Sequence, residues 1–228
     1  MGERCDVWWA DLADFPSAPD QAYLNLNDEE RARADRFLDR SDADLFSYRR
    51  ALTRTVLGLA SGAPPTEVMI SRECRLCGDP AHGKPRLMRP ANALEFSVSR
   101  TGTVVAIALT TGDEVGLDIE GIPALGAVDD TDVERAILTE WTRKESVLKA
   151  IGIGLALDPG EVVVSRSHEV PAVLQLPVPF APAAQFSLRE VVLRPDIVGH
   201  VAVRGEEPDV VVHHASQLLS EFGLVSAR

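Results

Sequence analysis

The chain has 228 residues, 45% of them apolar, and a mean hydropathy near zero, which suits a globular protein of one large domain or two small lobes. No unbroken apolar run reaches membrane-spanning length, and the N-terminus lacks a basic region followed by an apolar one. We therefore expect no membrane segment and no signal peptide. Three cysteines argue against the disulfide framework of a secreted protein, so we expect a cytoplasmic location.

The net charge of −12 argues against nonspecific binding to nucleic acid, because proteins that bind it usually present a basic face. This charge is unevenly distributed. Residues 1–100 hold 14 Lys and Arg against 16 Asp and Glu, whereas residues 101–228 hold 9 against 19. An anionic ligand would therefore find its counter-charges in the relatively basic first half.

The first half is expected to begin with a strand at residues 5–12, followed by a loop at 14–19. Asn27, which precedes three acidic residues, predicts the start of a helix that runs on through Phe37. A second helix is expected over residues 44–60, because apolar residues recur there at helical spacing. The two helices carry Arg31, Arg33, Arg36, Arg49, Arg50 and Arg54. Such arginines either contact a ligand or, as most surface arginines do, simply face water.

A short strand is expected at residues 66–72, followed by Cys74 and Cys77 in a C-x-x-C spacing with His82 close behind. A structural zinc ion needs four ligands, and no second Cys or His pair follows at a suitable interval. We therefore favour two thiols in a loop over a metal site. Residues 83–86 (GKPR) then place two cations on a rigid turn.

Residues 93–99 and 102–110 are apolar and β-branched, which predicts a hairpin. The next expected strand, 114–120, has apolar residues on one face and Asp118 and Glu120 on the other. Two carboxylates on one face of a strand can share a divalent cation with oxygen ligands. The alternative is an ordinary strand end that runs into an acidic turn.

A helical segment at 130–139 leads into a helix that begins near Glu140 and ends before Gly152. On this helix Trp141, Glu145 and Lys149 are four residues apart, so they share one stripe. The stripe is either a solvated helix face with an ordinary Glu–Lys pair or part of a site. Three further strands are expected at 161–165, 186–193 and 200–203, with a Pro-rich loop over 171–182, and the segment 218–225 is given no assignment.

The two halves have a similar order of elements, since each offers a strand, two helical segments and further strands. This order predicts an α+β protein with two similar lobes, residues 1–112 and 113–228. A cleft between the lobes would place the relatively basic first half opposite the acidic residues of the second. Such a cleft suits a polyphosphate bound through a metal ion.

Four motifs in order carry a resemblance to a known family: G-K-P at 83–85, F-S-V-S at 96–99, G-L-D-I-E at 116–120 and W-x-x-K-E-S-x-x-K-x-x-G-x-G-L at 141–155. Together they resemble the signature of the 4′-phosphopantetheinyl transferases of the Sfp type. The resemblance extends from the first strand to His200.

The resemblance implies a pseudo-duplicated, monomeric α+β fold with its site in the cleft between the lobes. It implies transfer of the phosphopantetheine arm of coenzyme A to a serine of an acyl or peptidyl carrier protein, with Mg²⁺. The net charge and the lack of a long apolar run separately argue against a nucleic-acid or membrane partner. The implied metal ligands are Asp118, Glu120 and Glu145, and the implied catalytic residues are Glu145 and Lys149. The implied contacts of coenzyme A are Lys84, Pro85, Ser99, Arg100, Lys144, Lys149, Arg31, Arg33 and Arg54.

The chain departs from the family pattern in two places. Ser97 and Arg100 stand where the family commonly has Asn and His, so the phosphate-binding charge is kept and a titrating imidazole is lost. Asp118 and Trp141 are 23 positions apart, closer than is usual in the family, which contracts the segment that borders the carrier-protein site; Glu134 could replace an acidic residue of that segment.

Two other functions remain open at this point. A homologue that binds coenzyme A or a carrier protein with weak or no transfer would keep the same motifs. An Mg²⁺-dependent phosphodiester hydrolase could use the same carboxylates, but it would leave the four ordered motifs unexplained.

Overall fold

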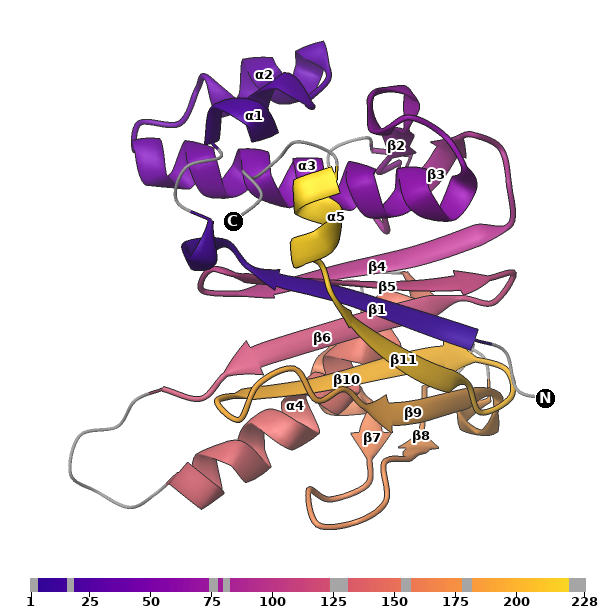
Figure 1. Ribbon diagram of the computed structural model, residues 1–228. Helices are drawn as coiled ribbons and strands as arrows, with labels where there is room; N and C mark the ends of the chain where they lie inside the picture. Colours follow the sequence, from indigo (N-terminus) through magenta and orange to yellow (C-terminus); the bar gives the residue numbers. More distant parts are fainter. Residues whose placement is uncertain are drawn as a thin grey trace.

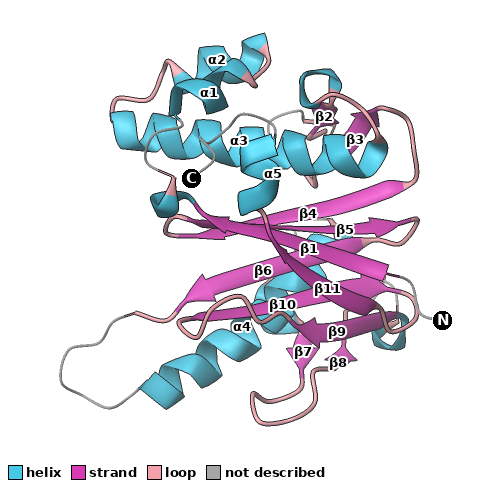
Figure 2. Ribbon diagram, in the orientation of Figure 1, coloured by secondary structure: helices cyan, strands magenta, loops and turns pink. Residues whose placement is uncertain are grey.

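The chain folds into the mixed α+β architecture that the sequence predicts (Figures 1 and 2). The computed structural model describes residues 4–15, 19–73, 78–79, 83–123, 131–152, 157–177 and 182–221. The helices are α1 Pro19–Leu24, α2 Asp28–Ala34, α3 Arg40–Ser61, α4 Thr131–Ile151 and α5 Ser216–Glu221. The strands are β1 Arg4–Asp11, β2 Met69–Ser71, β3 Arg86–Arg89, β4 Leu94–Thr101, β5 Val104–Thr111, β6 Val115–Gly121, β7 Val163–Val164, β8 Val173–Gln175, β9 Phe186–Glu190, β10 Ile197–Arg204 and β11 Asp209–His214. Cys74, Cys77, His82, Gly154 and Leu155, which belong to motifs singled out above, lie outside the described residues.

The principal elements form four layers, with α3 on one outer face and α4 on the other (Figure 1). Between them lie a four-stranded sheet of order β11-β1-β5-β4, the first sheet, and a three-stranded sheet of order β6-β10-β9, the second sheet. Two small antiparallel pairs, β2-β3 and β7-β8, complete the described strands. The outer strands β4 and β6 are close neighbours, and this junction positions the candidate site.

Each interface between layers is apolar. The layer between α3 and the first sheet includes Leu52, Val56, Phe96, Ile107 and Leu219. The layer between the two sheets includes Val7, Ala106, Leu117, Ile119 and Val201. The layer between the second sheet and α4 includes Val147, Leu148, Ala150, Leu188 and Ala202. Burial of these side chains holds both long helices against the sheets.

Helix boundaries follow the capping signals in the sequence. Asn27 forms a capping box with Glu30 at the start of α2, but α2 ends at Ala34, three residues before the predicted end. The helix predicted at 44–60 is α3, which begins four residues earlier because Asp39 caps it, and Gly62 ends it with a φ of 71°. The two helical segments predicted around residue 140 form one continuous helix, α4.

Among the described residues, none of the helices is long and apolar enough to cross a membrane.

Five of the helices and strands given above were not predicted from the sequence: α1, β3, β8, β11 and α5. β8 lies within residues 171–182, which were expected to form a loop. α1 begins at Pro19, the last residue of the loop expected at 14–19, and runs to Leu24 through residues that were given no assignment. β11 pairs in parallel with β1, with Arg4 opposite Asp209, so a late strand completes the first sheet. α5 follows directly, and its Leu218 and Leu219 are buried with the core around α3.

Candidate active site

The carboxylates of β6 lie on the face of the strand that points toward α4. Leu117 and Ile119 are fully buried between the two sheets, whereas Asp118, 4% exposed, and Glu120 alternate with them and project the other way. The predicted alternation is therefore present, and it turns both acids toward the helix that carries Glu145.

Gly116 allows α4 to lie directly against the backbone of β6. A Cβ atom on Gly116 would lie 1.9 Å from the carbonyl oxygen of Ser146 and 2.3 Å from the backbone nitrogen of Ala150. Only glycine leaves room for this contact. The close approach brings Glu145 and Lys149 to the acidic face of β6.

Asp118 is tied to one residue from each neighbouring layer. Its Oδ1 accepts a hydrogen bond from Ser99 Oγ at 2.9 Å and an ion-pair hydrogen bond from Lys149 Nζ at 2.6 Å. Lys149 Nζ also donates to Ser99 Oγ at 3.1 Å. The other oxygen, Asp118 Oδ2, is buried and has no hydrogen-bond partner among the described residues.

The three carboxylates form one electrostatic group. Burial raises the pKa of Glu145 above its usual value, and the negative charge of Asp118 raises it further. Glu120 has a raised pKa for the same two reasons, with Glu145 adding to the effect. Burial also raises the pKa of Asp118, although Lys149 opposes that shift. A cation placed among these groups would relieve their mutual repulsion.

The donor set suits a hard divalent cation, since it consists of carboxylate oxygens and includes the unpaired Asp118 Oδ2. The arrangement is nevertheless not a ready-made metal cluster. Within the described ranges, no three His, Cys, Asp or Glu side chains are gathered closely enough to hold a metal ion. Lys149 provides the positive charge beside Asp118 instead.

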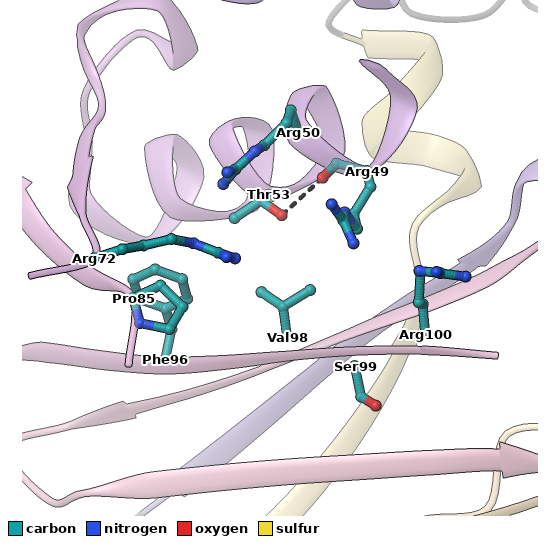
Figure 3. A pocket seen from close by; sticks show the side chains of 9 residues that line it. All are labelled: Arg49, Arg50, Thr53, Arg72, Pro85, Phe96, Val98, Ser99 and Arg100. Atoms are coloured by element: carbon teal, nitrogen blue, oxygen red, sulfur yellow. Dashed lines mark hydrogen bonds between the residues drawn. The ribbon is translucent and has the colours of Figure 1, made fainter. Parts of the chain in front are cut away.

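A pocket lined by four arginines lies on the other side of β4 (Figure 3). It has a volume of about 60 Å³, enough for a few waters or one phosphate group. Its lining comes from α3, from the segment after β2, from the turn before β3 and from β4. The lining residues are Arg49, Arg50, Thr53, Arg72, Pro85, Phe96, Val98, Ser99 and Arg100. We call this space the arginine pocket.

The arginine pocket has an excess of positive charge. Arg50 lies 3.6 Å from a Glu30 oxygen, while no ion pair of Arg49, Arg72 or Arg100 is found in the described part of the chain. The Nε atoms of Arg50 and Arg72 are buried without a hydrogen-bond partner there. Burial and the neighbouring guanidinium groups lower the pKa values of Arg49 and Arg50 to about 10, so both stay cationic at neutral pH. An anion would satisfy these donors.

Of the phosphate contacts expected from the sequence, Pro85, Ser99 and Arg100 line the arginine pocket. Lys84 is buried elsewhere: its Nζ donates to the carbonyl oxygen of Ala150 at 3.1 Å and lies 3.2 Å from a Glu95 carboxylate oxygen. Lys84 thereby holds the last turn of α4. Lys144 Nζ donates to the carbonyl oxygen of Pro159 at 3.2 Å.

The three remaining candidates lie around α2 and α3, outside the pocket lining. Arg54 is almost fully buried, pairs with Glu30 at 2.8 Å and donates to backbone carbonyl groups. Arg31 donates to the carbonyl oxygen of Leu24 at 2.8 Å. Arg33 is exposed, but its positive charge helps to lower the pKa of Arg72. Arg33 therefore adds to the positive electrostatic potential of the pocket. A phosphate contact by these three remains a prediction.

Three pocket residues were not among the site residues chosen from the sequence: Arg49, Arg50 and Arg72. The sequence around Arg49 and Arg50 does contain a local indication. Neither has an acidic residue three or four positions away on its own helix, so neither can form the usual intrahelical ion pair. Arg72 had no such signal, because only the tertiary fold brings it to α3.

No protein-family profile matches the chain. The chain is similar to the 4′-phosphopantetheinyl transferase HetI of Nostoc sp. strain PCC 7120, with 26% identity over 226 residues that cover 90% of each protein. This similarity confirms the resemblance predicted from the four motifs.

Proposed function

We propose that this 4′-phosphopantetheinyl transferase moves the phosphopantetheine arm of coenzyme A to a serine of an acyl or peptidyl carrier protein, with Mg²⁺, and so converts the apo carrier into its holo form. The enzyme class rests on the similarity to HetI and on the four ordered motifs. The carrier, the metal ion and the residue roles are our proposal.

One observation carries the proposal: the arginine pocket and the carboxylate group meet at Ser99. Ser99 borders the arginine pocket, and its side chain points to the opposite face of β4 (Figure 3), where its Oγ lies 2.9 Å from Asp118 Oδ1. Coenzyme A has a phosphate on its ribose and a pyrophosphate beside it. A molecule whose ribose phosphate occupies the arginine pocket can direct its pyrophosphate toward Asp118, Glu145 and Lys149.

In the proposed reaction, the serine hydroxyl of the carrier attacks the phosphorus that bears the pantetheine arm, and the bond to adenosine 3′,5′-bisphosphate breaks. Glu145, directly or through a water molecule, takes the serine proton. Its raised pKa brings its basicity closer to the working pH, which improves a general base. Lys149, 32% exposed at its side chain, lies at the same place and would stabilise the charge on the departing phosphate.

Asp118, Glu120 and Glu145 would hold the Mg²⁺ ion. When bound, Mg²⁺ would stabilise negative charge on the phosphate oxygens. The support for these ligands is the buried, unpaired Asp118 Oδ2 and the mutual electrostatic influence of the three carboxylates. Lys149 Nζ lies 2.6 Å from Asp118 Oδ1 and would therefore be close to a phosphate group placed beside these carboxylates.

The carrier protein would dock along α4. Val133, Ile137 and Trp141 are 58%, 63% and 43% exposed and follow one another at a spacing of four residues. The same stripe continues to Glu145 and Lys149. An apolar carrier surface placed on this stripe would bring its serine to the carboxylates.

We also propose that the fold arose by pseudo-duplication and acts as a cytoplasmic monomer with lobes at 1–112 and 113–228. Each half supplies one long helix, one small antiparallel pair of strands and then one longer antiparallel pair. In the first half these are α3, β2-β3 and β4-β5; in the second they are α4, β7-β8 and β9-β10.

The test incubates the protein with Mg²⁺, coenzyme A and several apo carrier proteins and follows the carriers by mass spectrometry. We expect at least one carrier to gain the mass of phosphopantetheine. Coenzyme A bound without transfer would instead support a binding homologue, and cleavage of coenzyme A without carrier would support a hydrolase.

Glu145→Gln should reduce transfer by about 10²-fold or more while the protein still melts cooperatively, because the variant removes the proposed base and a metal ligand. Glu140→Gln is the matched control, since it makes the same change on a different face of α4. Near-normal transfer by Glu145→Gln would remove Glu145 from the proposed chemistry.

A further inference from the structure

Strand β4 separates the two parts of the site, and its side chains alternate between two chemically different faces. Val98 and Arg100 line the arginine pocket under α3. The opposite face carries hydroxyl groups at Ser97, Ser99 and Thr101. Ser97 and Ser99 are 5% and 6% exposed, so these hydroxyls are set in the interior of the protein.

These three hydroxyls join the first sheet to the second, because each accepts a hydrogen bond from a backbone N–H group of β6. The donor-to-acceptor distances are 3.0 Å from Leu117 N to Ser97 Oγ, 3.3 Å from Ile119 N to Ser99 Oγ and 2.9 Å from Gly121 N to Thr101 Oγ1. Among the described residues, β4 and β6 share no backbone-to-backbone hydrogen bonds and belong to different sheets. We call this row of side-chain bonds the hydroxyl seam.

We propose that Ser97 and Thr101 are positioning residues that set the register of β6 against β4 and thereby place the carboxylates relative to the arginine pocket. The inference rests on the proposed function, in which coenzyme A spans both parts of the site. The apolar contacts between the two sheets are not directional, so they specify the offset of β6 against β4 less strictly than hydrogen bonds do. The hydroxyl-to-amide bonds favour one offset, because their geometry is strict.

Register matters here because β6 carries Asp118 and Glu120 on alternate positions. A shift of one residue would turn both acids away from α4 and into the apolar layer between the sheets. Smaller displacements also reduce the rate, since a misplacement of about 1 Å can cost about 10²-fold in a reaction that depends on alignment. The pocket arginines lie on α3, on β4 and after β2, so loosening β6 leaves them in place.

The test uses Ser97→Ala, Thr101→Val and the double variant. Ser99 is left intact because it contacts Asp118 and Lys149 directly. Three quantities are measured: hydrogen exchange of the Leu117 and Gly121 amides, the dissociation constant of coenzyme A, and kcat with an apo carrier. Thr101→Ser restores a hydroxyl at the seam. Thr110→Val removes a buried strand hydroxyl that donates to the carbonyl oxygen of Asp113, away from the seam.

In the double variant, we expect amide protection at Leu117 and Gly121 to fall about tenfold, as for the loss of one hydrogen bond each. We expect kcat to fall about tenfold to a hundredfold, with the dissociation constant of coenzyme A within about twofold of the original value. Thr101→Ser should keep both protection and kcat. Thr110→Val should lower the melting temperature without lowering kcat.

An unchanged kcat in the double variant, or an equal loss of kcat in Thr110→Val, would overturn the positioning role. If the double variant does not fold, the two single variants decide the question by the same measurements. A protein that transfers nothing to any carrier refutes the proposed function and with it the positioning role. Hydrogen exchange distinguishes the two failures, because unchanged protection in the variants refutes the seam itself.

Discussion

In the described part of the chain, the four arginines of the pocket have few ion-pair partners. Arg100 is the most exposed of the four. It lies near the end of β4, on the face that lines the pocket (Figure 3), at the position where the Sfp-type transferases commonly have histidine. We expect Arg100→Ala to raise the dissociation constant of coenzyme A about tenfold to a hundredfold, the loss typical of a hydrogen bond to a charged group.

Isothermal titration with coenzyme A measures this effect, and single-turnover transfer at saturating coenzyme A should change much less. Arg89→Ala is the matched control, since Arg89 is exposed on β3 outside the pocket lining. A normal dissociation constant for Arg100→Ala would exclude Arg100 from the coenzyme A site.

His200 makes the stability of the protein depend on pH. It is 1% exposed, its Nδ1 lies 2.8 Å from Thr142 Oγ1, and its Nε2 accepts a hydrogen bond from Arg143 Nε at 3.3 Å. Burial, together with the Arg143 charge, lowers the pKa of His200 from 6.5 to about 3. The unfolded chain therefore binds a proton that the folded protein rejects between these two values.

This contribution to stability is complete above pH 6.5 and is lost as the pH falls toward 3. The free energy of unfolding should fall by about 1.4 kcal/mol per pH unit below 6.5 from this group alone. Urea denaturation of the wild type and of His200→Gln at several pH values isolates that slope by difference. Parallel pH profiles of the two proteins would contradict the assignment.

The residue-level prediction from sequence succeeded where a signal is local. Asp118 and Glu120 share a face because strand side chains alternate, and Glu145 and Lys149 share one because a helix repeats every 3.6 residues. The arginine pocket was predicted only in part: Pro85, Ser99 and Arg100 were among the expected contacts, but Arg49, Arg50 and Arg72 were not. Residues from α3, β4 and the segment after β2 converge only in the folded protein. Lys84 illustrates the same limit: the sequence predicts a cation on a turn, and packing makes it a partner of Ala150 and Glu95.

Among the elements, the close packing of α4 on β6 depends on the absence of a side chain at Gly116. We expect Gly116→Ala to destabilise the protein by about 3 kcal/mol or more, because the added methyl group would meet backbone atoms of α4 that cannot rotate away. Lifting α4 would also separate Glu145 from Asp118 and lower transfer. Guanidinium denaturation and the transfer assay measure the two effects.

Gly121→Ala is the matched comparison on the same strand. Its added Cβ would lie 3.2 Å from the side-chain oxygen of Thr101, which can shift slightly, so we expect a smaller loss of stability. Equal losses at the two glycines would show that the contact with α4 is not the decisive one.

Elements with strong patterns were predicted well, including β1, the β4-β5 hairpin, β6, α3 and α4. The strand β11 was not, because six residues with two histidines at the end give little hydrophobic alternation. β11 forms by pairing with β1. Because the two strands are far apart in the sequence, this pairing produces no local sequence pattern.

At the scale of the whole molecule, the first sheet is built from both ends of the described chain. A fragment of residues 1–112 lacks β11 and the buried Leu218 and Leu219 of α5. We expect this fragment to show no cooperative thermal unfolding by circular dichroism, because β1 loses a neighbour and the core beside α3 is opened. A cooperative transition in the isolated fragment would show that β11 and α5 are dispensable for the first lobe.

The parallel pairing of β1 with β11 also determines how late in synthesis the first sheet can be completed. β1 is made first, yet its neighbour on that side is made about 200 residues later, which takes roughly 10 to 40 s on the ribosome. We expect β1 to present an unpaired edge next to apolar side chains throughout that interval. We therefore expect an aggregation-prone intermediate during synthesis. The yield in cells should depend on chaperones that cover this edge until residues Asp209 to His214 have been synthesised.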